Sequence, residues 1–349
     1  MSVRLRSGHV VEPVSEEWLA KMEKIQKLYN HGMVRLIPDG WLYPTVFTNF
    51  ADKIYNFKFK SSDVVVMAVP KSGTTWMQEI LWTMLHNPDL KNPLANTSIF
   101  MRSPDIESDM FADGKGRGDE GSGGFDQMFQ FLCPGKDPED GMFVQLCEFL
   151  PDPRIIKTHL PLSLLPPDYL DKTKVVYMVR EPKDLIVSMY HFFRFMKIFS
   201  YTGSFDSFVR HFMDNDLLYT PYWPHVKMAW EKRDHPNLHF VFYEDMKADI
   251  MKELRKVNEF IGANLTEQQL ENVAQHTSFT SMRERGEPLM EGFWISEVKE
   301  KSGGFFRKGT TGDWKNHFSS ELEEEVNHWI ESNATDIGIT FKCGGSSSG

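Results

Sequence analysis

Short apolar runs alternate along this chain with segments whose apolar residues recur every three or four positions. The run Asp63–Val69 is rich in β-branched residues and lacks apolar–polar alternation, which is typical of a strand buried on both faces. Further strands are predicted at Arg154–His159 and Lys174–Arg180, and at Leu238–Tyr243, where apolar and polar positions alternate more clearly. All of these runs are far shorter than a membrane span.

Helical spacing between and after these strands predicts five helices. They cover residues 74–85, 181–196, 249–261, 266–276 and 319–332. Gly262 is suited to end the third helix, and Thr266 to cap the start of the fourth. Strands that alternate with helices indicate a mainly parallel sheet flanked by helices on both faces. We therefore predict a single α/β domain over residues 1–343.

Two segments depart from this pattern. Residues 112–124 contain six glycines in thirteen positions and almost no apolar side chain, so we predict a flexible surface loop. Residues 344–349, with only Gly and Ser, are predicted to be a disordered tail or linker.

Composition narrows the function classes. The 349 residues are 41% hydrophobic, which is enough for a sizeable core without disulfides or metals. The 49 acidic and 39 basic residues give a net charge of −10, which argues against nucleic acid or a membrane surface as partner. The three cysteines, Cys133, Cys147 and Cys343, lack the spacing of a disulfide framework or zinc site. With no signal-like segment, a cytoplasmic location is expected.

The turn Pro70–Trp76 lies between a predicted buried strand and a predicted helix. Free backbone N–H groups and the helix dipole make such a P-loop-like position suitable for phosphate or sulfate. Gly73 permits close approach, Thr74 and Thr75 add hydroxyl groups, and Lys71 adds a charge. The order of Lys71 and Gly73 differs from that of a nucleotide kinase loop, and a simple capped helix is the alternative.

The sequence Pro70–Trp76 resembles the 5′-phosphosulfate loop of the cytosolic sulfotransferases, which use 3′-phosphoadenosine 5′-phosphosulfate (PAPS). Five further blocks follow in that family's order: Lys157–Leu162, Val179–Asp184 with Ser188, Phe242–Met246, His276–Phe279 and Phe306–Trp314. The chain is identified as an invertebrate-like member with a long substrate-lid insertion. The resemblance implies the sulfotransferase fold, PAPS as donor, adenosine 3′,5′-bisphosphate (PAP) as product and no metal.

Sulfuryl transfer needs charge stabilisation and a base, and the matching residues supply both. The resemblance implies His159 as the general base, Lys71 at the leaving phosphate and Lys157 at the sulfuryl oxygens. Ser188 is the fourth residue of the expected catalytic set. An isolated strand-end histidine is more often structural, but its place in the Lys157–Leu162 block favours the base. Lys157, two positions before His159, shares its face of the strand.

The resemblance also implies the nucleotide site. Arg180 and Ser188 match the family's 3′-phosphate contacts, and the segment 305–309 is expected to close over the nucleotide. The full expected set is Lys71, Ser72, Gly73, Thr74, Thr75, Trp76, Arg180, Ser188, Tyr243, Thr277, Ser278, Phe279, Met282, Phe305, Phe306, Arg307, Lys308 and Gly309.

Three features depart from the family pattern. Asp105 follows the triplet Arg102-Ser-Pro104, where family members that prefer phenols usually have aromatics, so Asp105 is a candidate substrate contact; a solvent-facing loop carboxylate is the alternative. Glu181 beside Arg180 has no evident role in the sequence. The family's dimer segment is only partly present in Lys315–Glu324, so a homodimer is possible but open.

These observations predict a sulfotransferase that acts on a hydroxyl, or an amine, of a small and mainly apolar acceptor. The residues expected to contact the acceptor are Lys157, His159 and Asp105. An alcohol, a phenol or a steroid-like molecule would suit such a site. Two alternatives remain open: a dehydratase that works through a transient sulfate ester of an allylic alcohol, and a P-loop kinase.

Overall fold

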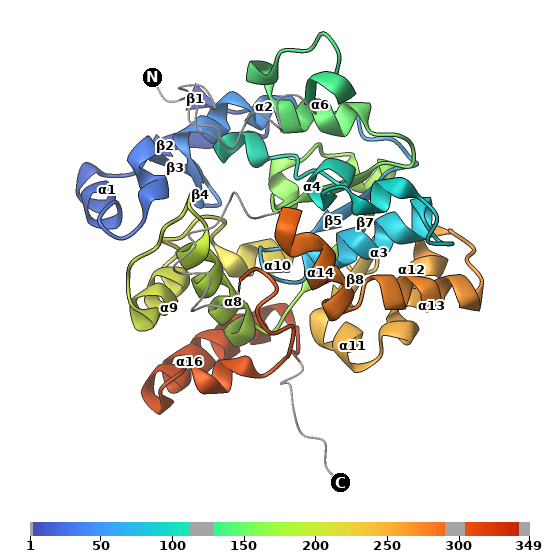
Figure 1. The fold of residues 1–349 in the computed structure, drawn as a ribbon. Coiled ribbons are helices and arrows are strands. Elements are labelled where there is room, and N and C mark those ends of the chain that lie inside the picture. The colour runs from blue at the N-terminus through green and yellow to red at the C-terminus, as the bar shows by residue number, and fades with distance from the viewer. Residues whose placement is uncertain (1–2, 112–128, 290–303, 342–349) are drawn as a thin grey trace.

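A four-stranded parallel sheet forms the centre of the fold (Figure 1). The computed structural model of the chain describes residues 3–111, 129–289 and 304–341. The strands are ordered β6-β5-β7-β8, with β5 at Val64–Met67, β6 at Ile155–Thr158, β7 at Lys174–Val179 and β8 at Leu238–Phe242. All four predicted strands are confirmed, and all four run parallel to their neighbours.

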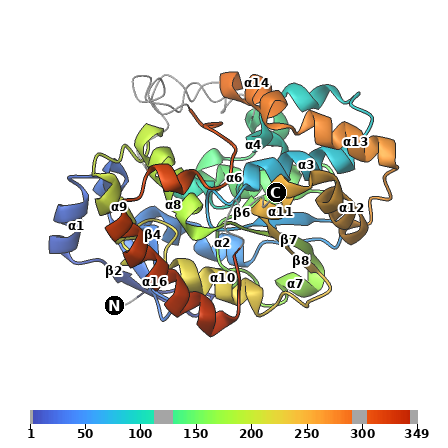
Figure 2. The same ribbon diagram turned by 90° about the horizontal axis from the view of Figure 1, so that it is seen from below.

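Apolar side chains alternate between the two faces of β5. Val65 and Met67 belong to a core with helices α8 (Pro182–Phe195), α9 (Phe205–Met213), α10 (Tyr222–Trp230) and α16 (Ser320–Ile337). Val64 and Val66 pack on the other side against α3 (Thr74–His86), α12 (Ile250–Ile261) and α13 (Glu267–His276). Helices therefore cover both faces, as the unbroken apolar run predicts (Figure 2).

The predicted helix ends are confirmed by their capping geometry. Gly262 adopts the left-handed conformation that ends α12. Thr266 and Gln269 form a reciprocal capping box at the start of α13. Helix α16 continues five residues beyond the predicted end, until Gly338 terminates it in the same left-handed conformation.

A second, antiparallel sheet at the N-terminal side was not predicted. It contains β1 (Val3–Arg4), β2 (Val10–Pro13), β3 (Met33–Ile37) and β4 (Trp41–Pro44), paired in that order. Strands of two to five residues give little periodic signal. The turn Asp39-Gly40 between β3 and β4 was the available hairpin signal.

Shorter helices connect these layers. They are α1 (Glu16–Met22), α2 (Ala51–Tyr55), α4 (Ile99–Arg102), α6 (Met142–Phe149), α7 (Tyr169–Lys172), α11 (Tyr243–Ala248) and α14 (Phe279–Leu289). The predicted flexible loop 112–124, the tail 344–349 and Cys343 lie outside the described residues. Cys133 and Cys147 are buried free thiols. In the described ranges, no helix has the length and apolar character needed to cross a membrane.

Candidate active site

A cavity of about 570 Å³ opens at the carboxyl ends of β5, β6 and β7. This edge of a parallel sheet is where ligands bind in open α/β folds. The cavity is lined by Asp105, by all four proposed catalytic residues, and by every expected nucleotide residue except two. The exceptions are Ser72, whose buried hydroxyl donates to the carbonyl of Val69 at 2.9 Å, and Ser278, which is exposed at the start of α14.

The loop after β5 is shaped by two left-handed residues. Lys71 has φ 72° and Gly73 has φ 100°. A Cβ on Gly73 would lie 2.7 Å from Cδ2 of Tyr243, so only glycine fits between the loop and that ring. Gly73 also precedes α3, whose first backbone N–H groups have no partner within the helix. The loop therefore presents an anion-binding helix start to the cavity.

Lys71 extends from this loop into an aromatic enclosure. Its Nζ lies 4.4 Å from the ring centre of Phe192 and 4.1 Å from that of Phe305. Burial and the positive charges of Arg180, Lys157 and Arg307 lower the pKa of Lys71 to about 7. Within the described ranges, no ion pair with a carboxylate involves Lys71. Its ammonium group is therefore suited to meet an anionic ligand.

His159, directly after β6, has a defined tautomer. Its Nδ1 lies 2.6 Å from the carbonyl oxygen of Ala68, which can only accept, so Nδ1–H donates and Nε2 is left as the acceptor. Burial and the charge of Lys157 lower the pKa of His159 to about 3, so the imidazole is neutral at pH 7. The ring of Tyr219 packs against it edge-on, with centroids 5.3 Å apart. The geometry is that of a general base with its proton-accepting nitrogen available.

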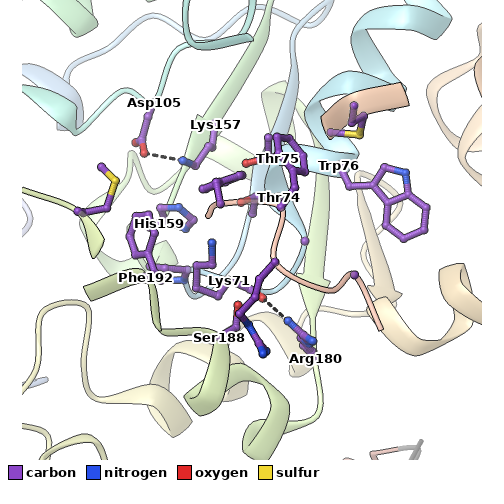
Figure 3. Close-up of a pocket in the computed structure, with 18 of the residues that line it drawn as sticks. Lys71, Thr74, Thr75, Trp76, Asp105, Lys157, His159, Arg180, Ser188 and Phe192 are labelled. Carbon is purple, nitrogen blue, oxygen red and sulfur yellow. Dashed lines mark hydrogen bonds and ion pairs between the residues drawn. The ribbon is translucent and has the colours of Figure 1, made fainter. Parts of the chain in front are cut away.

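Lys157 and Asp105 form a buried ion pair at the neighbouring position. Nζ of Lys157 lies 2.9 Å from Oδ2 of Asp105, and both side chains are less than a tenth exposed. The alternative of a solvent-facing Asp105 is therefore wrong. Figure 3 shows Lys71, Lys157 and His159 converging on one space, with Asp105 behind Lys157.

Glu107 supports this group and was not predicted. Its buried carboxyl accepts hydrogen bonds from the backbone N–H of His159 and from the hydroxyl of Thr158, the latter at 2.9 Å. Burial and the neighbouring charge of Asp105 raise the pKa of Glu107 well above its usual value. Tyr219 was also missed, and neither residue lies within the family's sequence blocks.

Arg180 joins the phosphosulfate loop to the segment that follows Gly309. Its guanidinium donates to the carbonyls of Lys71 and Thr310, each at 3.2 Å, and lies 4.5 Å from the ring centre of Tyr243. Its buried Nε has no hydrogen-bond partner within the described residues. An unsatisfied buried donor at the cavity wall fits a phosphate oxygen.

Arg307 and Lys308 both pair with Asp313. Each cation lies 2.6 Å from one carboxylate oxygen of Asp313. Burial alone would raise the pKa of Asp313, but hydrogen bonds from Lys308, Asn316 and Arg307 lower it. A Cβ on Gly309 would clash with the ring of Phe279, which brings this loop against α14. The two expected phosphate-binding cations are thus held together at the cavity rim.

Trp76, Thr277, Phe279 and Met282 line the far end of the cavity. Trp76 lies on the other side of the loop from Phe192 (Figure 3), and its buried Nε1 has no partner among the described residues. Lys247, which the sequence did not predict, also lines this end, with Nζ 5.7 Å from the Trp76 ring centre. A flat ring with polar edges, such as adenine, suits these surroundings.

Glu181 has a structural explanation. Its carboxylate accepts from the backbone N–H of Asp184 at 2.8 Å and so caps α8. Its own N–H donates to Glu244 at 3.0 Å. Burial raises the pKa of Glu181 to about 7. The residue therefore fixes the start of the helix that carries Ser188 and Phe192.

The end of the cavity beside His159 is mainly apolar. The side chains that form it include Phe100, Phe111, Phe143, Phe192, Met196, Ile198 and Phe199. Three further phenylalanines belong to residues 105–156, the segment where the substrate-lid insertion is expected. Phe129 is buried in a separate cluster, Phe131 is 83% exposed, and Phe125 lies outside the described residues.

Comparison with known proteins identifies this arrangement. The family model for the sulfotransferase domain matches residues 61–338. The chain belongs to the sulfotransferase family. It is 35% identical to sulfotransferase 1A1 of Rattus norvegicus, over 83% of this chain and 90% of the relative. It is 32% identical to sulfotransferase 1E1 of Homo sapiens, over 85% and 92% respectively.

A solved structure extends the likeness to three dimensions. Retinol dehydratase in a complex with retinol and PAP matches with a TM-score of 0.82 and 28% identity, over 96% of this chain and 99% of that one. As a member of this family, the sulfotransferase uses PAPS as the sulfuryl donor. In the described ranges, no group of His, Cys, Asp and Glu residues could hold a metal ion.

Proposed function

We propose that this sulfotransferase transfers the sulfuryl group to a hydroxyl of a small, mainly apolar alcohol, phenol or steroid-like acceptor. The observation that carries the proposal is the set of apolar side chains, mostly aromatic, that line the same cavity as His159, whose Nε2 is left as the acceptor. Apolar walls with one convergent polar group are typical of sites for small organic ligands. An amine acceptor is compatible with the same base.

The proposed roles follow from the charges around that end. Nε2 of His159 takes the proton of the acceptor hydroxyl as its oxygen bonds to sulfur. Lys157 stabilises the sulfuryl oxygens, while Lys71 interacts with the oxygen that breaks from sulfur and stays on the phosphate. Ser188 lines the same cavity, and its match to the family's 3′-phosphate contacts favours a place on the nucleotide. The products are the sulfate ester and PAP, with the proton on His159.

At the other end, Arg180, Arg307 and Lys308 are proposed to bind the 3′-phosphate. Trp76, Phe279 and Met282 are proposed to enclose the adenine, with Thr277 and Tyr243 as lesser contacts. A homodimer also stays a prediction: Lys315 and Glu324 of the partial dimer segment are exposed, whereas Leu322 lies in the core.

The experiment is incubation with ³⁵S-labelled PAPS and a panel of alcohols, phenols, sterols and amines. Labelled sulfate esters of apolar hydroxyl compounds, with an equal amount of PAP, are the expected result. Label transfer confined to strongly charged or highly hydroxylated acceptors would contradict the proposed class. A variant lacking His159 is the control for uncatalysed transfer.

Net dehydration through a transient sulfate ester is a second candidate. The likeness to retinol dehydratase over nearly the whole chain favours including it. In that case an allylic alcohol would lose water, and inorganic sulfate would be released in amounts equal to PAP. Mass spectrometry of the product separates the two outcomes, because an ester retains the sulfate and a dehydrated product does not. Family membership leaves no support for the kinase alternative.

A further inference from the structure

Asp105 is the carboxylate that lies against a proposed catalytic cation in this site. It is 5% exposed, lines the cavity, and belongs to the segment that follows α4. The carboxyl of Glu107 accepts from the backbone N–H of His159 and also shares a hydrogen bond with the side chain of Asp105. The contact of Asp105 with a proposed catalytic group is the ion pair with Lys157.

Backbone pairing dictates this contact. The N–H of Lys157 donates to the carbonyl of Pro104 at 2.9 Å, and the N–H of Ile106 donates to the carbonyl of Lys157 at 3.0 Å. Asp105 and Lys157 thus form a parallel β-bridge. Side chains of paired residues in a parallel ladder lie on the same face. The strand register therefore places the carboxylate of Asp105 next to the ammonium group of Lys157.

Of the two neighbouring carboxyl groups, Asp105 is more acidic than Glu107. Burial alone would raise the pKa of Asp105, but the charge of Lys157 and the hydrogen bonds with Glu107 and Lys157 hold it below its usual value. Burial and the charge of Asp105 raise the pKa of Glu107 well above its usual value, so Glu107 holds its proton more readily than Asp105. Oδ2 of Asp105 lies 2.9 Å from Nζ of Lys157.

A sulfuryl group of the donor at Lys157 would compete with the carboxylate of Asp105 for the ammonium group of Lys157. Its oxygens are anionic, and an anion beside the Asp105 carboxylate is repelled at short range in a site of low dielectric. PAP lacks the sulfuryl group, so it brings no sulfuryl oxygen to Lys157 and should be repelled by Asp105 less than PAPS is. Asp105 is thus placed to weaken the binding of donor more than that of product.

We propose that Asp105 is the resting counter-ion of Lys157, and that Lys157 exchanges it for the sulfuryl oxygens when PAPS binds. This inference rests on the position proposed above for Lys157 in the reaction. It makes Asp105 a positioning residue that lowers the affinity for the donor relative to PAP, the product.

The test is the ratio of PAPS to PAP affinity in Asp105→Asn, titrated without acceptor at pH 6 by tryptophan fluorescence. Removing the carboxylate should tighten PAPS binding about tenfold, because the competing anion is gone, while PAP binding changes less than about twofold. The control Asp105→Glu keeps the charge and should keep a ratio close to that of the parent protein.

Equal shifts for PAPS and PAP would overturn the proposal, and so would weaker PAPS binding with PAP unchanged. PAP binding reports whether a variant is folded. If Asp105→Asn does not bind PAP, Asp105→Ser removes the charge and leaves room for water. The same increase in PAPS affinity relative to PAP affinity is then expected for Asp105→Ser. An unchanged ratio in an enzyme that sulfates apolar acceptors refutes this inference alone. Failure of every acceptor in the panel refutes the proposed class, and the ratio remains measurable.

Discussion

The two lysines of the reaction centre are embedded in opposite ways. Lys157 lies at the end of a strand, with the carboxylate of Asp105 at 2.9 Å. Lys71 lies in a left-handed loop between the rings of Phe192 and Phe305, with no ion pair recorded in the described ranges. The strand end carries its own counter-charge, whereas the loop obtains one only from a ligand. Under the proposed mechanism, the loop needs a ligand anion to neutralise Lys71, whereas Lys157 already has a counter-ion before a ligand binds.

The largest expected effect comes from removing the base at the strand end. His159→Ala should lower kcat by about 10² to 10⁴, the usual range for losing a general base, while the loop still binds PAP normally. The measurements are turnover with the best acceptor and PAP affinity by titration. His328→Ala, on the exposed face of α16, is the matched control. Activity within a few-fold of the parent would remove His159 from the mechanism.

A second variant examines the rim of the anion site. Arg307→Ala should weaken PAP binding about 10- to 100-fold, because a charge-assisted contact to the 3′-phosphate is lost. Binding of adenosine 5′-phosphate, which has a 3′-hydroxyl, should change less than about threefold. Isothermal titration of both nucleotides gives the comparison, with Arg233→Ala at the surface as control. Equal losses for the two nucleotides would exclude the 3′-phosphate role.

The smallest effect concerns the pH dependence of donor binding. With a pKa of about 7, Lys71 is an ammonium below pH 7 and increasingly a neutral amine above it. An anionic donor binds the charged form, so PAPS affinity should be constant below pH 7. Above pH 7 it should fall by up to about tenfold per pH unit. In Lys71→Arg, which stays charged, this slope should disappear. A slope that persists in the arginine variant would assign it to another group.

The sequence predicted the elements with a strong local signal. β5 and β7 are nearly continuous apolar runs, and the capping residues Gly262 and Thr266 mark helix ends by their own chemistry. The N-terminal sheet was missed because charged residues and proline interrupt its short strands, so they show neither an apolar run nor clear alternation.

The site was predictable only where a residue type is tied to a local motif. Lys71, Gly73 and His159 lie in such motifs, and all three line the cavity. The contacts of Glu107 with Thr158 and His159 join positions about fifty residues apart, and no local pattern encodes them. The same holds for the pairing of Asp105 with Lys157, which depends on the register of a β-bridge.

That β-bridge also covers part of an exposed edge of the parallel sheet. β6 is an outer strand of the parallel sheet, and an outer strand with free N–H and C=O groups can recruit a strand from another molecule. The segment Pro104–Ile106 occupies the outward-facing groups of Lys157. The edge nearest the reaction centre is thereby closed to a second chain at that position, which favours solubility over edge-to-edge aggregation.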